Sequence, residues 1–268
     1  MLDQELRFSG SVPEKYDQLM VPLIFRPYAE ELARRAKAIA PRMVLETAAG
    51  TGVVTEALND VLPDAKIIAT DLNPPMLEVA GKRVRSERVR FVQADAQDLP
   101  FEGESFDLVL CQFGSMFFPD KVRGHFEARR VLRDGGCYLL AIWDSIERNA
   151  LSRAAQQALI DCFPQDPPLF MREGPFGYSD PLRIKSDLQC AGFDTIEIET
   201  VGMRSRSPSA HDAAMALFYG TPMGVEVEEK RAGSGKRVFE AVEQALSQFE
   251  GEDGIDAPMA AHIVTASR

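Results

Sequence analysis

The sequence has few of the residues that build metal centres and disulfide frameworks. Among its 268 residues there are four cysteines and three histidines. No two cysteines form a Cys-x-x-Cys pair and the histidines are scattered, so a zinc site and a disulfide-stapled fold are both poorly supported. We therefore expect a reduced, cytoplasmic protein that holds no metal.

Long hydrophobic runs and basic charge are also scarce. No apolar stretch reaches the roughly 18 residues of a membrane-spanning helix, and we expect no signal peptide because the first residues lack its basic and apolar regions. The net charge of −11 argues against a nucleic-acid surface, since a polyanion binds to a basic face. Arg204 and Arg206 are the best candidates for a local basic patch, and a solvated loop is the competing interpretation.

Short apolar runs alternate with helical segments along the first half of the chain. The predicted strands lie at residues 43–45, 66–70, 89–93, 106–111 and 137–143. Strands that alternate with helices favour βαβ units and a parallel sheet. The near-continuous apolar character of these runs fits strands that are buried on both faces.

A turn of very small residues follows the first predicted strand. Residues 44–52 read Val-Leu-Glu-Thr-Ala-Ala-Gly-Thr-Gly, so a buried strand runs into the turn and then into a helix predicted over 52–58. Small side chains let a ligand lie against the backbone, and a helix start offers free N–H groups. This pattern is typical of a nucleotide-type cofactor site.

Asp71 ends the second predicted strand, 21 residues after Gly50. A carboxylate at about this spacing can accept hydrogen bonds from a ribose diol; the alternative is that Asp71 caps the helix beginning near Pro74. Both features also fit a dinucleotide-binding dehydrogenase. However, the Gly-x-Gly-x-x-Gly/Ala fingerprint would place Gly or Ala where this chain has Thr55, so the sequence disfavours a dinucleotide.

An acidic segment follows the third predicted strand. A carboxylate there would share the rim of the sheet with Asp71 and could accept a hydrogen bond from an adenine amino group. Asp95, beside the small Ala96, fits this role better than Asp98. The alternative is a solvated loop carboxylate.

Five motifs then occur in one order along the chain. They are Glu46-x-Ala-x-Gly50-x-Gly52, Asp71 followed by Pro74 and Met76, Asp95-Ala96, Phe106-Asp-Leu-Val109 and Leu132-Arg-Asp-Gly-Gly136. Together they resemble the class I S-adenosylmethionine methyltransferases, most closely the type 11 group with its ubiquinone and menaquinone C-methyltransferases. The resemblance covers residues 14–143 and fits elements at 191–193 and 262–266. One departure is Ala48, where the family has its first loop glycine; this change is mild if φ stays negative.

The resemblance implies the fold and the cofactor. We expect an α/β, Rossmann-like, doubly wound and mostly parallel seven-stranded sheet with an antiparallel last strand, helices on both faces and a helical cap insertion. The chain would be a single domain over 1–268, with its core at 14–201 and 259–268 and the cap at 202–258. The cofactor would be S-adenosyl-L-methionine, and the partner a small-molecule acceptor. A homo-oligomer is possible but not indicated.

The resemblance also assigns site residues. Facing the methionine half of the cofactor would be Glu46 and the backbone of Thr47, Ala48 and Gly50. The ribose and adenine would lie against Asp71, Leu72, Met76, Asp95 and Ala96. Beside the sulfonium and the substrate entrance would be Cys111, Gln112 and Phe113. Tyr16 resembles a tyrosine that closes over the cofactor, and a core tyrosine is the alternative.

No residue is a convincing general base, because His125 is expected on a helix surface, His211 at a helix start and His262 in a structural position. The apolar segment 213–219, with aromatic residues at strand ends, is expected either to cap an acceptor pocket or to be plain core. The aromatic residues are Phe117, Phe118 and Trp143. The predicted function is methyl transfer to a small molecule; the alternatives are a non-catalytic S-adenosylmethionine-binding protein and, third, an NAD-dependent reductase.

Overall fold

The computed structural model describes residues 12–268. Contacts within the chain divide it into two compact units. The sheet unit comprises Arg26–Trp143, Tyr178–Val201 and Ala261–Arg268, and the helical unit comprises the described residues 12–25 with Asp144–Gly177 and Gly202–Ala260. Within the described residues, no helix has the length and apolarity needed to cross a membrane.

The sheet has the order β3-β2-β1-β4-β5-β8-β6, with a short β7 paired to β8. Its strands are β1 (Met43–Glu46), β2 (Lys66–Asp71), β3 (Val89–Gln93), β4 (Phe106–Gln112), β5 (Leu132–Trp143), β6 (Thr195–Ser207), β7 (Glu250–Gly251) and β8 (Gly254–Ser267). The first five pair in parallel, and β8 pairs antiparallel with β5. The chain winds outward from β1 to β3 and then returns to β4 on the other side of β1, which creates a topological switch point there. The predicted α/β class, parallel sheet and antiparallel last strand are confirmed; β7 was not predicted.

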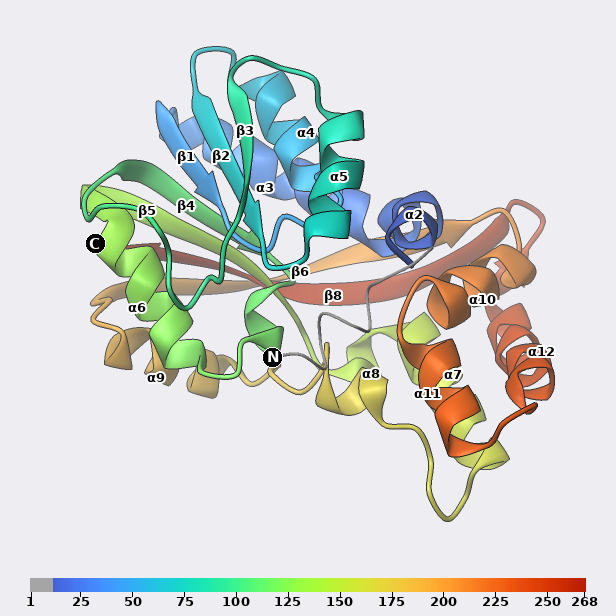
Figure 1. Cartoon of the computed structure of the whole chain (residues 1–268). Helices are drawn as coiled ribbons and strands as arrows, with labels where there is room; N and C mark the ends of the chain where they lie inside the picture. The colour runs from blue at the N-terminus through green and yellow to red at the C-terminus, as the bar shows by residue number, and fades with distance from the viewer. Residues whose placement is uncertain (1–11) are drawn as a thin grey trace. The chain divides into compact units, whose positions relative to one another are not determined.

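Two groups of helices cover this sheet (Figure 1). One group is α3 (Arg26–Ile39), α4 (Val53–Val61) and α5 (Pro74–Arg83), and the other is α6 (Lys121–Val131) and α9 (Pro181–Cys190). Leu45, Leu108 and Leu110 are fully buried in the central strands, as expected for strands covered on both faces. The strand order, with helices packed on the sheet, is the doubly wound arrangement that was predicted.

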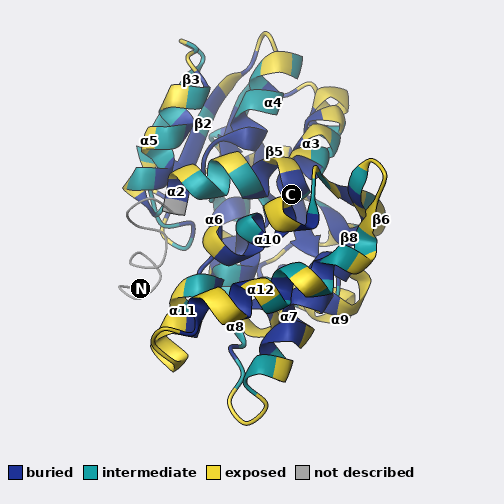
Figure 2. Ribbon diagram, turned by 90° about the vertical axis from the view of Figure 1, so that its right-hand side faces the viewer, coloured by how far each residue is buried: buried dark blue, intermediate teal, exposed yellow. Residues whose placement is uncertain are grey.

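The helical unit has a core of its own. Its elements are α2 (Val12–Lys15), a π-helix η1 (Tyr16–Phe25), η3 (Ile146–Arg148), α7 (Ala150–Cys162), α8 (Phe170–Glu173), α10 (Ala210–Tyr219), α11 (Met223–Lys230), α12 (Gly235–Leu246) and η4 (Ser247–Phe249). On α12, Val238, Val242 and Leu246 recur at helical spacing and are fully buried. Figure 2 shows α12 banded in buried and exposed colours. The stripe stabilises the unit because it removes apolar area from water.

Several predicted boundaries differ from the structure, and β5 begins at Leu132 and not at residue 137. The residues 22–40, rich in Ala, Leu, Glu and Arg, predict one helix, but Pro22 lies inside η1 and α3 begins at Arg26; a proline lacks the N–H of a regular α-helical ladder, and a π-turn accommodates it. The glycines and proline of 220–224 predict a turn, but α11 already begins at Met223. The strands beside the insertion continue into residues 202–258, because β6 ends at Ser207 and β8 begins at Gly254.

Candidate functional site

The turn after β1 combines three residues in the left-handed region. Ala48, Gly50 and Gly52 have φ values of 52°, 55° and 82°. A Cβ added to Gly50 would have no atom within 4 Å, so space is open beside this residue. The turn ends at Gly52, which is the N-cap of α4 and gives it no side-chain cap, so first-turn N–H groups remain available for a ligand.

Ala48, which replaces the first loop glycine of the family, does not have the negative φ that would make this change mild. Its φ is positive, and a left-handed conformation costs an alanine roughly 1–2 kcal/mol. The methyl group is accommodated by a second loop, because a Cβ on Gly114 would lie only 2.4 Å from the Ala48 Cβ. Gly114 therefore provides the room that this alanine needs.

Asp71 joins the turns after β1 and β2. One carboxylate oxygen accepts from the Gly50 N–H and the other from the Asn73 N–H, each at 2.8 Å. Burial raises the pKa of Asp71, while these N–H donors lower it. The N-cap of α5 is Asn73 and not Asp71, so the helix-cap alternative is wrong. A carboxylate has about four acceptor positions, so capacity for ribose hydroxyls remains.

Glu46 ends β1 and is 2% exposed. Oε2 accepts from the Thr55 hydroxyl at 2.6 Å, whereas Oε1 receives no hydrogen bond from the part of the chain that the structure describes. Burial raises the pKa of Glu46 to about 8, and the nearby Asp71 carboxylate adds to the rise. A carboxyl oxygen that receives no hydrogen bond from the described residues indicates a place for a cationic or hydrogen-donating ligand group.

The predicted adenine-side residues fall on neighbouring loops of the same sheet edge. Asp95 is half-buried and accepts from the Gln97 N–H at 2.8 Å, while Asp98 is exposed. Met76 and Ala96 are buried and apolar, and Leu72 is half-buried. Because Ala94 N–H donates to the Asp71 carbonyl, the loops after β2 and β3 run together. These residues fit an adenine-binding wall, and their roles stay predictions.

The end of β4 carries a buried cysteine, Cys111, next to the turn that follows the strand. The thiol of Cys111 is fully buried. Burial raises the pKa of this thiol to about 11, although the Thr47 hydroxyl and the N–H groups of Gly114 and Ser115 oppose the rise, so the thiol is neutral. Gln112 beside it is half-buried.

Phe113 has a φ of 53° and is buried. Its ring stacks on Trp143 at 3.8 Å and meets Tyr28 edge-on at 5.3 Å. These three rings fix the loop after β4 to the sheet unit. Trp143 and Phe118 are buried as well, at 2% and 9% exposure.

Sequence reasoning missed three hydroxyl groups at this edge. Thr55 holds Glu46, although the sequence offered it only as evidence against a dinucleotide. The hydroxyls of Thr51 and Ser115 are buried and have no hydrogen-bond partner among residues 12–268. An orphaned buried hydroxyl costs about 1–3 kcal/mol, so these two indicate further ligand-facing positions. The sequence places both residues in the loops after β1 and β4, and this position could have indicated that they face the ligand.

The remaining candidates belong to other elements of the chain. Tyr16 belongs to the helical unit, where it stacks on Phe25 at 5.0 Å. His125 is fully buried and lies between the hydroxyls of Tyr138 and Tyr178, so the expected surface position is wrong; α6 packs on α9 and β5, which sequence periodicity did not reveal.

The other two histidines are placed as predicted. His262 is buried and hydrogen-bonds to the Thr200 hydroxyl and the Ser179 carbonyl, which is a structural position. His211 is exposed in the first turn of α10 and pairs with Glu243. Neither histidine lies on the loops that carry the site.

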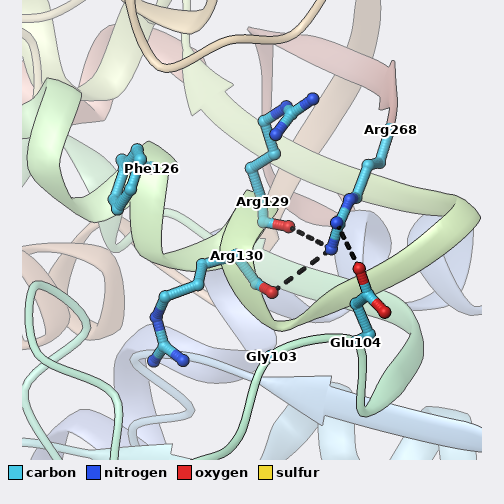
Figure 3. Close-up of a pocket in the computed structure, with 6 residues that line it drawn as sticks. All are labelled: Gly103, Glu104, Phe126, Arg129, Arg130 and Arg268. Atoms are coloured by element: carbon cyan, nitrogen blue, oxygen red, sulfur yellow. Dashed lines mark hydrogen bonds and ion pairs between the residues drawn. The ribbon is translucent and has the colours of Figure 1, made fainter.

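A hollow of about 350 Å³ lies at the opposite edge of the sheet, beside the amino ends of β4 and β5. It is lined by Gly103, Glu104, Phe126, Arg129, Arg130 and Arg268 (Figure 3). Its cations are engaged, because Arg268 pairs with Glu104 and Arg130 pairs with Glu127. The hollow is thus separate from the glycine-rich turn.

Comparisons with known proteins agree with this geometry. Residues 44–136 match the profile of a methyltransferase domain. The demethylmenaquinone methyltransferase of Deinococcus radiodurans is 36% identical over 49% of this chain, and the chain spans 56% of the length of that relative. The corresponding enzyme of Clavibacter sepedonicus is 30% identical over 61% of this chain and 70% of its own length.

Solved structures extend the likeness to most of the chain. The YcgJ protein of Bacillus subtilis superposes with a TM-score of 0.59 at 20% identity, over 90% of this chain and 99% of the other. At that identity the likeness shows the fold, which is the Rossmann-like fold of methyltransferases. With the sequence relatives, it confirms the expected resemblance: the chain belongs to the class I S-adenosylmethionine-dependent methyltransferases.

Proposed function

We propose that this protein transfers the methyl group of S-adenosylmethionine to a small, partly apolar acceptor by in-line displacement, leaving S-adenosylhomocysteine. The observation that carries this proposal is the pair of carboxyl groups at the glycine-rich turn, of which Glu46 is buried and Asp71 half-buried. Glu46 keeps one oxygen without a partner, and Asp71 holds the turn in shape through the Gly50 N–H. Open space lies beside Gly50.

These residues fit the cofactor. Oε1 of Glu46 would accept from the ammonium of its methionine part, and Asp71 would accept from its ribose hydroxyls. Met76 and Ala96 would cover the adenine, with Asp95 at its amino edge. When bound, S-adenosylmethionine supplies a methyl group on a sulfonium, which is already a good electrophile. The chain then has to align the acceptor and keep water out.

The acceptor is a separate part of the proposal. Two relatives are named for demethylmenaquinone, so reduced quinones head the candidates. The net charge of −11 disfavours nucleic acid. The buried His125 is engaged by two tyrosines, so we assign no base.

The test is an acceptor screen with the purified full chain and methyl-labelled S-adenosylmethionine. We expect S-adenosylhomocysteine to form in step with a product heavier by one methyl group. A chain that binds both sulfur ligands but turns over no acceptor would be the non-catalytic binding protein. Failure to bind either ligand, with NAD bound instead, would revive the reductase alternative.

A further inference from the structure

A short hydrogen bond links the two elements on either side of the glycine-rich turn. Thr55 lies in the first turn of α4, and its hydroxyl reaches back to Glu46 at the end of β1, with an oxygen–oxygen distance of 2.6 Å. Thr55 is 0% and Glu46 2% exposed. Water therefore does not compete for this bond, which is of the strong type when its acceptor is charged.

The bond occupies one oxygen of the carboxylate and leaves the other. Oε2 is fixed by Thr55, while Oε1 has no hydrogen-bond donor among the described residues. Because a carboxylate is planar, fixing Oε2 also fixes the direction in which Oε1 points. A threonine is suited to this task, since its branched side chain has restricted χ1 in a helix.

We propose that Thr55 is a positioning residue of the donor site: its hydroxyl holds Glu46 so that Oε1 meets the cationic methionine end of the cofactor. This inference rests on the proposed function, and it assigns a role to a residue that lies outside the five family motifs.

The groups that face Glu46 make its binding of a cation depend on pH. They are Asp71 on β2 and Cys111 on β4. Burial raises the pKa of Glu46 to about 8, and the hydrogen bond from Thr55 opposes that rise. Near neutral pH the ligand-free carboxyl group therefore holds a proton, which an incoming ammonium displaces. Affinity should rise with pH up to about 8 and level off above it.

Thr55→Val removes the hydroxyl at nearly constant shape, and Thr55→Ser keeps it. The probe is S-adenosylhomocysteine, which carries the ammonium, with 5′-methylthioadenosine as the ligand that lacks it. Calorimetry from pH 6 to 9 would measure both dissociation constants for the wild type and each variant.

We expect Thr55→Val to weaken S-adenosylhomocysteine binding about tenfold at pH 7 and to move the rise in affinity to higher pH. Thr55→Ser should stay within about threefold of the wild type, a difference below the 1.4 kcal/mol of a tenfold change. Methylthioadenosine should bind all three proteins alike, with no pH dependence. Superimposed profiles for wild type and Thr55→Val, or equal losses for both ligands, would overturn the inference.

Two outcomes separate this inference from the function on which it rests. A wild-type protein that binds neither S-adenosyl ligand at any pH refutes the proposed function itself. If Thr55→Val does not fold, Thr55→Ala replaces it, because alanine also lacks the hydroxyl and is smaller. Equal affinity of Thr55→Ala and the wild type for S-adenosylhomocysteine across the pH range would then refute the inference.

Discussion

Gly114→Ala should be among the most damaging single-methyl changes in the sheet unit. A Cβ at this position would lie 2.4 Å from the Ala48 Cβ and 2.9 Å from the Cys111 sulfur. Carbon atoms prefer separations of about 3.5–4.0 Å, so the first contact is too short by more than about 1 Å. Alanine has no rotamer with which to withdraw, and the loop backbone must move. Overpacking of this kind costs about 1–3 kcal/mol, and we expect the upper end.

A double-mutant cycle tests this contact, and its second substitution is Ala48→Gly. Alone, it relieves a positive φ of 52° and should change the free energy of unfolding by about +1 kcal/mol or less, because the lost methyl contact offsets the relief. Combined with Gly114→Ala, it removes the 2.4 Å contact but leaves the one to Cys111. The double variant should therefore recover part of the loss, with a coupling energy of at least about 1 kcal/mol.

Urea denaturation of the wild type, the two single variants and the double variant measures the free energies of unfolding. The affinity of each protein for S-adenosylhomocysteine reports whether the glycine-rich turn keeps its conformation. Gly81→Ala is the matched control, because its new Cβ would meet its nearest neighbour, Phe91, at 4.0 Å inside α5. That variant should be neutral or more stable by up to about 1 kcal/mol. A Gly114→Ala protein within about 0.5 kcal/mol of the wild type, or strictly additive effects, would refute the reasoning.

Four further outcomes are expected. Asp71→Ala should weaken S-adenosylhomocysteine binding by about 1.5–3 kcal/mol in calorimetry and also lower stability, because two N–H groups lose their acceptor; an unchanged dissociation constant would remove Asp71 from the site. Because the pKa of Glu46 is raised to about 8, the folded protein keeps a proton that the unfolded chain has lost. The free energy of unfolding should therefore fall from about pH 5 to 8, by at most roughly 1.4 kcal/mol per pH unit. Urea titrations of Glu46→Gln should show a flatter slope. Burial lowers the pKa of His125 to about 4, so stability should also fall as pH drops from about 6.5 towards 4, and a flat acid profile would contradict this. The Tyr219 side chain is 37% exposed, so Tyr219→Ala should impair acceptor turnover and leave cofactor affinity within about threefold of the wild type. The Phe218 side chain is 2% exposed, so Phe218→Ala should lower the free energy of unfolding. If Tyr219→Ala loses turnover and cofactor binding in parallel, its segment is core.

Local patterns made the sheet unit predictable. The strands ending at Glu46, Asp71 and Gln112 each differ from prediction by one residue at the carboxyl end, because short apolar runs bounded by turn residues leave little choice of register. Asp180 followed by Pro181 predicts the start of a helix, and Asp180 caps α9, accepting from the Leu182 N–H at 2.9 Å. Such signals depend on residues close together in the chain.

Elements set by tertiary contacts were harder to predict. The helix α11 begins beside Gly224, which suggests a turn in isolation, yet a Cβ there would meet the Phe218 ring at 2.9 Å. Close packing against α10 therefore explains this glycine. Likewise, the burial of His125 depends on Tyr138 and Tyr178, which are 13 and 53 residues away in the chain.

The site divides in the same way. Spacing pointed to Asp71 and the small-residue turn as candidates, but it could not give the sign of φ at Ala48 or the opposing Gly114, since these depend on two loops meeting. It also could not pair Thr55 with Glu46, although nine residues separate them. The turn between them places the first turn of α4 back against the end of β1, which the sequence does not specify.

The carboxyl groups of Glu46 and Asp71 also explain why this edge of the sheet suits a cofactor that carries positive charge. The buried Glu46 and the half-buried Asp71 end adjacent parallel strands, and a charge at either position is costly because it is partly or wholly removed from water. The nearby Asp71 raises the pKa of Glu46, because one negative charge beside another is unfavourable. A ligand that brings an ammonium and a sulfonium relieves that repulsion. Thr55 occupies the position where the dinucleotide fingerprint needs a small residue, and its hydroxyl keeps the Glu46 carboxyl group beside the turn, where it can accept from a cationic ligand group.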